Sequence, residues 1–372
     1  MLKGIAEIWP QQRGNPFPVI TGTSAGAINA TVLAASAMRF RAGVARMVGV
    51  WSNFRSGKVI RDDGLNALRT GLHWAWSILT GGMGVGKPRS LLDNTPLRSL
   101  LEHQVNFARI QQSIDAGDLE ALAITASSYH RARSVTFFQA RDGIEGWSRT
   151  RREGMRCTLD LDHLMASVAI PVVFPAVWVR EDYYGDGSMR QAAPLSAAIH
   201  LGAERLLVIG LRSEGMSLLR QAPSEPEYPT LGSIAGYMLD TLFMDSLYSD
   251  LERLTRINQL LQDQGPAHGS AKVKEVAAHV ILPSEDVLEI TARHAKSMPR
   301  SVRFLLKSVG ALNSGGLPLV SYLLFEEGYC RELIALGYRD ALAQREHLLA
   351  FLSGETVDNL EAPDTIEDAI SR

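Results

Sequence analysis

The order of short apolar runs and helical segments predicts a layered α/β fold. Short β-prone runs alternate with helical segments as far as about residue 285, and this alternation is typical of layered α/β domains. One such run leads directly into Gly22-Thr23-Ser24-Ala25-Gly26 and an alanine-rich helix, which is the strand–turn–helix order of a nucleophile elbow. From Val287 onward the pattern is helical, so we expect an α-rich C-terminal part that forms a cap or an added layer.

In the N-terminal half, a helix with one apolar face is predicted for Met1–Trp9. The β-prone run is Phe17–Thr21, and the helix that follows the elbow covers Ala25 to Met38. A further helix continues through Arg39–Phe54. Residues 56–94 are glycine-rich and irregular, and a helix is expected from about Pro96 to Gln104.

The middle of the chain contains the remaining strand signals. Two β-like runs around Tyr129-His130-Arg131 predict a hairpin, and two short strands lead to Gly185-Asp186-Gly187. The predicted strands are Leu119–Ser127, Ser134–Ala140, Val177–Arg180, Asp182–Tyr184, Arg205–Leu211 and Val276–Pro283. The predicted helices are Leu161–Val168, Ala197–Leu201 and one long segment, Leu231–Leu261. A proline-containing loop is expected at Gln221–Thr230, and the acidic tail after Glu355 is expected to be frayed.

Composition narrows the class of protein. The chain has 372 residues, of which 46% are hydrophobic and 21% are charged, as in ordinary globular proteins. A net charge of −2 gives no indication of nucleic-acid binding. The two cysteines, Cys157 and Cys330, lack metal-ligand spacing and indicate a reducing compartment. With no apolar run long enough for a membrane span and no signal-peptide pattern at the start, a cytoplasmic location is expected.

Ser24 is the candidate nucleophile. In a G-x-S-x-G elbow the serine lies at the apex of a turn so tight that only very small residues fit at Gly22 and Gly26. The helix that begins at Ala25 would favour negative charge developing beside the serine hydroxyl. The alternative is a small-residue turn in which a helix merely packs close to a strand.

A serine nucleophile needs a base, which is usually a histidine held by a carboxylate. His130 in a hairpin tip, His163 on a helix and His200 near a helix end all have settings typical of surface or packed histidines. Asp186 is a better candidate, because Gly185 and Gly187 would let the backbone bring its carboxylate close to another loop. A shielded carboxylate can accept the proton of a serine hydroxyl. The alternative for Asp186 is a hairpin turn, for which Asp-Gly is a common signal.

These segments resemble the patatin-like phospholipases. The elbow motif is followed about 160 residues later by Gly185-Asp186-Gly187. Between them, Ala166-Ser167-Val168-Ala169-Ile170-Pro171-Val172-Val173-Phe174-Pro175 is similar to the family's A-S-x-A-x-P-x-x-F-x-P stretch, with the second proline one place early. The resemblance implies a three-layer α/β/α hydrolase fold and a Ser–Asp dyad without histidine. Ser24 would be the nucleophile, Asp186 the base, and the Ala25 N–H an oxyanion donor.

The resemblance also implies a domain division and a lipid acyl hydrolase of the phospholipase A or esterase type. Residues 1–215 would form the catalytic domain and 216–355 a mostly helical remainder with a strand near 276–283, while 356–372 would form a disordered acidic tail. The substrate would be a lipid or another acyl ester. No metal, organic cofactor or nucleic-acid partner is implied.

The sequence departs from the family pattern at its start. Members of the family begin with a strand and a glycine-rich loop that supplies oxyanion donors, whereas Leu2–Ile8 already resembles the helix that follows this loop. Losing one oxyanion donor costs about 2.7–4 kcal/mol in the barrier, and a missing strand would leave backbone groups of its neighbours unpaired. Two hypotheses follow: the true start lies upstream, or the chain is a non-catalytic lipid-binding or interaction protein.

Two further features have alternatives. Gly81–Lys87 fits the spacing of a phosphate loop, but Pro88 stands where a Ser or Thr hydroxyl should bind Mg²⁺, so a loop near the active site is the preferred interpretation. Two apolar stretches, His73–Leu79 and Val302–Phe325, would suit peripheral contact with a lipid surface. Their alternative interpretation is ordinary core.

Overall fold

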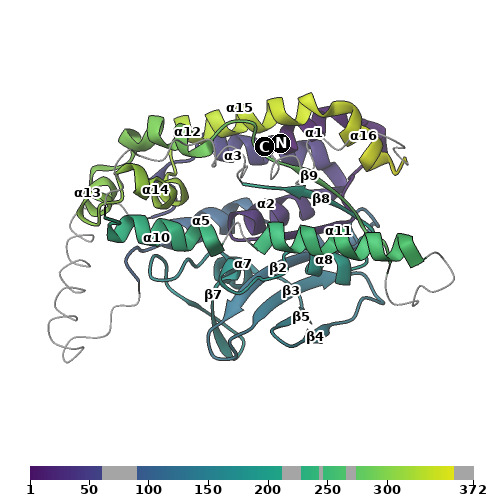
Figure 1. The fold of residues 1–372 in the computed structure, drawn as a ribbon. Helices are drawn as coiled ribbons and strands as arrows, with labels where there is room; N and C mark the ends of the chain where they lie inside the picture. The colour runs from purple at the N-terminus through teal and green to yellow at the C-terminus, as the bar shows by residue number, and fades with distance from the viewer. Residues whose placement is uncertain (61–89, 212–227, 243–245, 265–273, 356–372) are drawn as a thin grey trace.

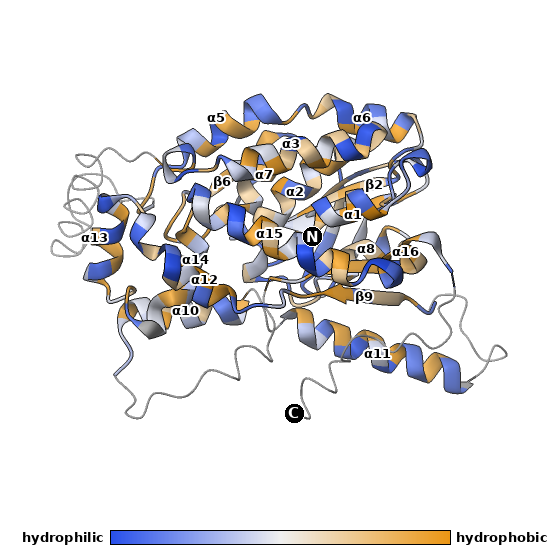
Figure 2. Cartoon of the chain, turned by 90° about the horizontal axis from the view of Figure 1, so that it is seen from above, coloured by the Kyte–Doolittle hydropathy of each residue, from blue (hydrophilic) through white to orange (hydrophobic). Residues whose placement is uncertain are grey.

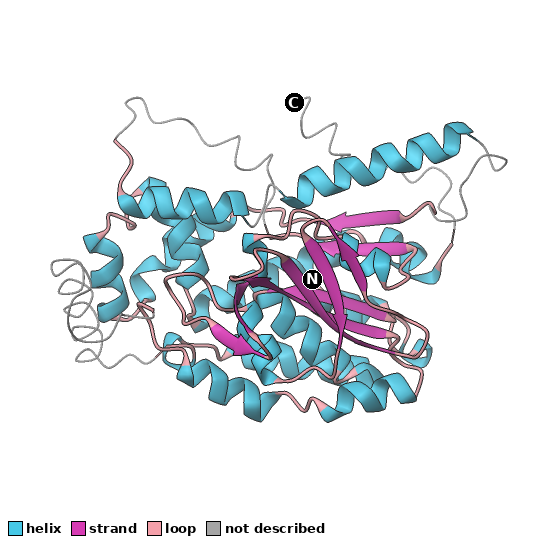
Figure 3. Cartoon of the chain, turned by 90° about the horizontal axis from the view of Figure 1, so that it is seen from below, coloured by secondary structure: helices cyan, strands magenta, loops and turns pink. Residues whose placement is uncertain are grey.

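The computed structural model describes residues 1–60, 90–211, 228–242, 246–264 and 274–355. Within this part of the chain the strands form two sheets with helices packed around them (Figure 1, Figure 3). Several sequence predictions lie outside the described residues. They are the apolar patch at His73–Leu79, the phosphate-loop pattern at Gly81–Lys87, most of the loop at Gln221–Thr230 and the acidic tail at 356–372.

The larger sheet has seven strands in the order β4-β5-β3-β2-β7-β6, and β1 also pairs with β2. The strands are β1 (Val19–Thr23), β2 (Ala121–Ser128), β3 (Ser134–Ala140), β4 (Trp147–Arg149), β5 (Arg152–Arg156), β6 (Val177–Val179) and β7 (Asp182–Asp186). The hairpin predicted around Tyr129-His130-Arg131 is confirmed, since β2 and β3 pair antiparallel. The sheet is therefore mixed rather than purely parallel.

Strand β2 lies at the centre of this sheet, and all eight of its residues are buried. Strand β3 pairs with β2 along 121–127 and so occupies one of its two edges. The other edge is shared: β1 pairs parallel with residues 121–125, and β7 pairs antiparallel with residues 126–128. The C-terminal ends of β1 and β7 therefore meet at adjacent positions along β2.

Helices cover both faces of the larger sheet. One face contributes Leu122 and Ile124 to the main hydrophobic core, together with Ala27 of α2 and Leu164 of α7. The other face contributes Ala121 and other residues to a smaller cluster that includes Leu201, next to α8. The helices of this part are α2 (Ala25–Ala34), α3 (Phe40–Ser52), α5 (Thr95–Gln104), α6 (Ala108–Asp115), α7 (Leu161–Ser167) and α8 (Ser196–His200). This is the three-layer α/β/α arrangement that the sequence predicts.

The second sheet has two parallel strands, β8 (Arg205–Ile209) and β9 (Ala277–Ile281). Within the described residues β8 pairs only with β9, and β1 pairs only with β2. Strand β1 of the larger sheet and strand β8 of the smaller sheet therefore each have one backbone edge that pairs with no other described strand.

The C-terminal part is largely helical, as predicted. Helix α15 (Glu327–Ala343) lies along α1 (Leu2–Ile8) at the top of Figure 1, and Gly4 allows a close approach because a Cβ there would be 2.6 Å from the Cβ of Ala341. The other helices are α10 (Leu231–Asp240), α11 (Ser246–Gln264), α12 (Val287–His294), α13 (Arg300–Ser308), α14 (Leu317–Leu323) and α16 (Arg345–Ser353). Strand β8 lies before residue 215 and β9 lies after it, so their pairing joins the two predicted domains. The division into domains at residue 215 stays a prediction.

The helical segment predicted for Leu231–Leu261 is confirmed for its described residues, which belong to two helices, α10 and α11; residues 243–245 between them lie outside the described part of the chain. The two helices pack in different places. Gly236 of α10 lies against Leu319 of α14, whereas Leu251 and Leu254 of α11 join a separate cluster with Leu206 of β8. Among the described helices, none is long and apolar enough to cross a bilayer.

Candidate active site

Ser24 stands at the junction between β1 and α2, as the elbow motif predicts. Its backbone has φ 55° and ψ −129°, a conformation that non-glycine residues rarely adopt and that costs about 1–3 kcal/mol. The turn is tight because a Cβ on Gly22 would lie 2.6 Å from the carbonyl carbon of Gly26 and 2.8 Å from the Cα of Ala27. At Gly26 no atom of the described chain lies within 4 Å of the equivalent position. The steric demand for glycine therefore falls on Gly22.

Asp186 is the last residue of β7 and lies directly opposite Ala126 of β2. Ser24 follows Thr23, which is paired with Thr125, the preceding residue of β2. Because β1 and β7 share one edge of β2, the candidate nucleophile and base occupy neighbouring positions. The sheet pairing thus explains how two residues 162 positions apart come together. Asp186 is a paired, buried strand residue, so a hairpin turn does not describe it.

The carboxyl group of Asp186 is almost completely shielded, with only 1% of the residue exposed. Its Oδ1 accepts a hydrogen bond from the Ser188 N–H at 3.0 Å. Its Oδ2 is buried, and no well-formed hydrogen bond reaches it from the described chain. Burial raises the pKa of Asp186 to about 6, against the opposing influence of the Ser24 hydroxyl and of Ser188. A general base that operates near neutral pH needs an oxygen that can accept a proton and a raised pKa. The Asp186 carboxyl group has both.

The segment at the end of α7 holds both catalytic candidates by their backbones. The Ser24 N–H donates to Ser167 Oγ at 3.0 Å, and this hydroxyl donates to the carbonyl of Thr125 at 2.7 Å. Two residues further on, the carbonyl of Ala169 accepts a hydrogen bond from the Asp186 N–H at 2.8 Å. This contact of Ser167 was not predicted, although the residue stands in the A-S-x-A segment that carries the family resemblance.

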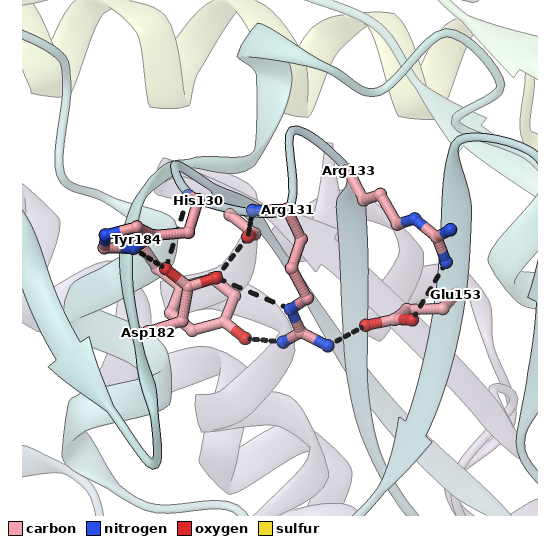
Figure 4. Close-up of polar contacts among 7 residues, drawn as sticks. His130, Arg131, Arg133, Glu153, Asp182 and Tyr184 are labelled. Carbon is pink, nitrogen blue, oxygen red and sulfur yellow. Dashed lines mark hydrogen bonds and ion pairs between the residues drawn. The ribbon is translucent and has the colours of Figure 1, made fainter.

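A network of charged groups ties the start of β7 to the end of β2 (Figure 4). Asp182, the first residue of β7, accepts hydrogen bonds from the Ser128 hydroxyl and from His130 Nδ1 at 2.7 Å. Burial acts to raise the pKa of Asp182, but these bonds outweigh it and hold the pKa at about 2. Arg131 joins the network through Asp182 and through Glu153 of β5 at 2.6 Å. The network thus adds side-chain contacts to the pairing of β7 with β2, which sets Asp186 opposite Ala126.

The three histidines considered as bases have other partners. His130 belongs to the Asp182 network, while His163 Nδ1 lies 2.6 Å from Asp160 in the capping box of α7. His200 stacks on Trp147 and contacts Ser196. The described chain contains no hydrogen bond between any of them and Ser24. It also contains no group of three His, Cys, Asp or Glu residues able to hold a metal ion.

Cys157 is a second nucleophilic side chain worth comparing. Its Sγ lies 3.7 Å from His163 Nε2, an arrangement that superficially resembles a Cys–His pair. Burial raises the pKa of Cys157 to about 11, so the thiol stays protonated near neutral pH and is a poor nucleophile. Cys157 is therefore a weaker candidate nucleophile than Ser24.

The glycines on either side of Asp186 meet different neighbours. A Cβ on Gly187 would lie 2.7 Å from the backbone carbonyl carbon of Thr125, whereas a Cβ on Gly185 would meet the side chain of Tyr129, 2.7 Å from its hydroxyl. Burial, and then the charge of Asp186, raise the pKa of Tyr129. Tyr129, at the tip of the predicted hairpin, therefore lies within electrostatic reach of the candidate base.

The family of the chain follows from comparison with known proteins. No curated protein matches the chain. The family model described as patatin-like phospholipase matches residues 1–199, which is more than half of the 372 residues and includes Ser24, the 166–175 segment and Asp186. The mixed sheet with flanking helices agrees with this family, whose members act on lipids. The chain therefore belongs to the patatin-like phospholipase family.

Proposed function

We propose that this protein cleaves acyl ester bonds of lipids with a Ser24–Asp186 dyad. The observation that carries the proposal is the shared edge of β2, where the ends of β1 and β7 bring Ser24 beside the buried carboxylate of Asp186. Membership of the family indicates a lipid acyl hydrolase, and the arrangement of these two residues supplies a specific mechanism for it.

In the acylation step, the ionised Asp186 carboxylate takes the proton of the Ser24 hydroxyl as Oγ attacks the carbonyl carbon of the ester. The carbonyl double bond becomes a single bond to a negatively charged oxygen. When this tetrahedral intermediate collapses, the bond to the alcohol oxygen breaks, and the leaving alcohol takes the proton from Asp186. Ser24 then carries the acyl group, and Asp186 is ionised again.

In the deacylation step, Asp186 takes a proton from a water molecule that attacks the acyl-enzyme. The bond between the acyl carbon and Ser24 Oγ breaks, and Oγ receives the proton from Asp186. The products are a free carboxylic acid and the original enzyme. One carboxylate thus serves as base and then acid in both steps, which requires a pKa that allows both states near neutral pH.

The developing oxyanion needs hydrogen-bond donors. The N–H of Ala25 belongs to the first residue of α2 and has no partner inside the helix, so it is the donor that we assign. The positive end of the α2 dipole adds to this stabilisation.

An apolar pocket begins one helical turn beyond Ser24; its lining suits an acyl chain, and its volume of about 30 Å³ means that side chains must move to admit one. Ile28 and Val32 of α2 face side chains of α3 and α5 across it, and the other main lining residues are Met47, Trp51, Leu97 and Leu101. Sites for apolar ligands are usually lined in this way. Filling the pocket with Val32→Trp should lower the rate with long-chain esters more than with acetyl esters.

The direct test is turnover of a short-chain chromogenic ester by purified wild-type protein and by the variants Ser24→Ala and Asp186→Asn. We expect loss of the wild-type rate in both variants, at least about 10³-fold in kcat, because nucleophile and base act as a unit. Equal background rates in all three proteins would refute the dyad. That result would favour the alternative of a non-catalytic lipid-binding protein.

A further inference from the structure

The most exposed large apolar side chains of the described protein gather in two neighbouring segments. Five such side chains, with exposures from 61% to 92%, all lie between residues 228 and 238 or in α13: Tyr228, Leu231, Tyr237, Met238 and Phe304. Single exposed apolar residues are normal on a protein surface, but a concentration of this kind marks an interaction site.

In α10 the apolar stripe is separate from the face that packs on the protein. Gly232 and Gly236 face inward, where a Cβ would lie 2.6 Å from the Cβ of Ala311 and 2.9 Å from the N of Leu319, respectively. The outward stripe consists of Leu231, Ile234, Tyr237 and Met238. No charged residue occurs in α10 before Asp240, and the helix is largely orange and white in Figure 2. Packing on the protein does not account for these outward side chains.

Helix α13 adds positive charge to an apolar surface. Val302 and Leu306 are buried, whereas Phe304, 76% exposed, projects outward between cationic residues. The cations are Arg300, Arg303 and Lys307, and α13 contains no acidic residue. Within the described residues none of the three forms an ion pair with a carboxylate. Arg303 donates a hydrogen bond to the carbonyl of Lys296 at 2.8 Å, which leaves its charge without a carboxylate partner in the described chain. The Phe304 ring and the positive charges of α13 are therefore available to a partner.

The two helices are joined where α13 ends and α10 begins. The Gly232 N–H donates to the carbonyl of Val309 at 2.7 Å, and the Thr230 hydroxyl donates to the carbonyl of Gly310 at 3.0 Å. These bonds hold α10 and α13 as one unit at the side of the molecule (Figure 1). We call this unit, with Tyr228, the α10–α13 surface.

We propose that the α10–α13 surface docks the protein on an anionic phospholipid bilayer. Tyr and Phe side chains next to Arg and Lys are the combination that binds at the boundary between headgroups and acyl chains, because the rings and methylene groups enter the apolar region while the cations meet phosphate groups. A protein partner would need acidic groups set opposite these cations, whereas an anionic bilayer supplies them at any position. The inference goes beyond the Ser24–Asp186 chemistry and does not depend on it.

The test is co-sedimentation of the full chain with phosphatidylcholine vesicles, with and without phosphatidylglycerol. We expect the wild type to bind the mixed vesicles more tightly. The pair Tyr237→Ser and Met238→Ser should weaken partitioning into both vesicles. The pair Arg303→Gln and Lys307→Gln should weaken binding to the mixed vesicles about tenfold or more and remove most of the preference for them.

A matched control removes exposed apolar groups elsewhere. Ile257 and Leu260 of α11 are also exposed, and serine at both positions should leave vesicle binding unchanged. An equal loss in this control, or no vesicle binding by the wild type, would overturn the proposal. So would light scattering that shows a wild-type dimer which the Tyr237/Met238 variant cannot form, since the surface would then join two copies of the chain. Turnover of a soluble short-chain ester by the surface variants separates this test from that of the dyad.

Discussion

Replacing Asp186 with asparagine should make the protein more stable at alkaline pH while abolishing its activity. Burial raises the pKa of this carboxyl from 3.8 to about 6, so the folded state favours the protonated form. The protonated carboxyl group therefore contributes to the free energy of unfolding. This contribution is fully present below about pH 4 and is lost as pH rises through 6. Two pKa units at about 1.4 kcal/mol each give roughly 3 kcal/mol as the cost of the buried charge at pH 8.

Asparagine removes that charge but keeps an oxygen that can accept the Ser188 N–H. Its amide nitrogen would take the place of Oδ2, which lacks a well-formed hydrogen bond to the described chain. An unsatisfied buried donor costs about 1–3 kcal/mol, and the Ser24 hydroxyl can relieve part of this by accepting a bond. The expected net gain at pH 8 is therefore about 1–2 kcal/mol, and at pH 4, where the charge cost has almost vanished, the variant should be slightly less stable than wild type.

The assay compares urea unfolding of wild type and Asp186→Asn at pH 4, 6 and 8, because the difference between the two proteins isolates the titration of one group. Ser24→Ala serves as the matched control, since it should also be inactive yet retain the buried carboxyl. Removing the hydroxyl that favours ionisation should make this control slightly less stable than wild type at pH 8. A stability difference between wild type and Asp186→Asn that does not change with pH would refute the reasoning, and so would an asparagine variant that is less stable at pH 8.

Three other predictions test the geometry around the dyad. Ser24→Gly should be about 1 kcal/mol more stable than Ser24→Ala in thermal unfolding, because glycine tolerates φ 55°; equal stability would mean that the elbow stores no such strain. Ser167→Ala should lower kcat more than it raises KM and cost about 1–3 kcal/mol in unfolding, since the Ser24 N–H loses its partner; unchanged kinetics would contradict the positioning role. Gly187→Ala should lower expression and activity far more than Gly185→Ala, because the first meets backbone and the second a side chain that can turn away. Similar effects at both glycines would contradict this difference.

The local features of the site could be predicted from the sequence because each depends on neighbouring residues. Gly22 before Ser24 and an alanine-rich stretch after it indicate the elbow, and glycines on both sides single out Asp186. The pairing that unites the two residues is not local. It depends on β7 running antiparallel to β2 and taking over its edge at Ala126, and no spacing in a single sequence fixes such a register.

Other features that depend on contacts between distant residues were also not predicted from the sequence. Helices α10 and α11 pack against two different clusters, to which the continuous helical pattern of Leu231–Leu261 gives no clue. The strands β4 and β5 were not assigned either, because Arg149, Arg152 and Arg156 make their sequences polar. Strand β5 joins the sheet by pairing with β3, and β4 joins it by pairing with β5.

The 166–170 segment holds Ser24 and Asp186 independently of each other. Ser167 and Ala169 bind the backbone N–H groups of Ser24 and Asp186, respectively, so the elbow and the base are held by main-chain hydrogen bonds rather than by each other's side chains. Removing either reactive side chain should therefore leave the other where it is. This independence is what allows the stability of Asp186→Asn to report the cost of one buried charge, and it predicts that Ser24→Ala and Asp186→Asn will fold as the wild type does.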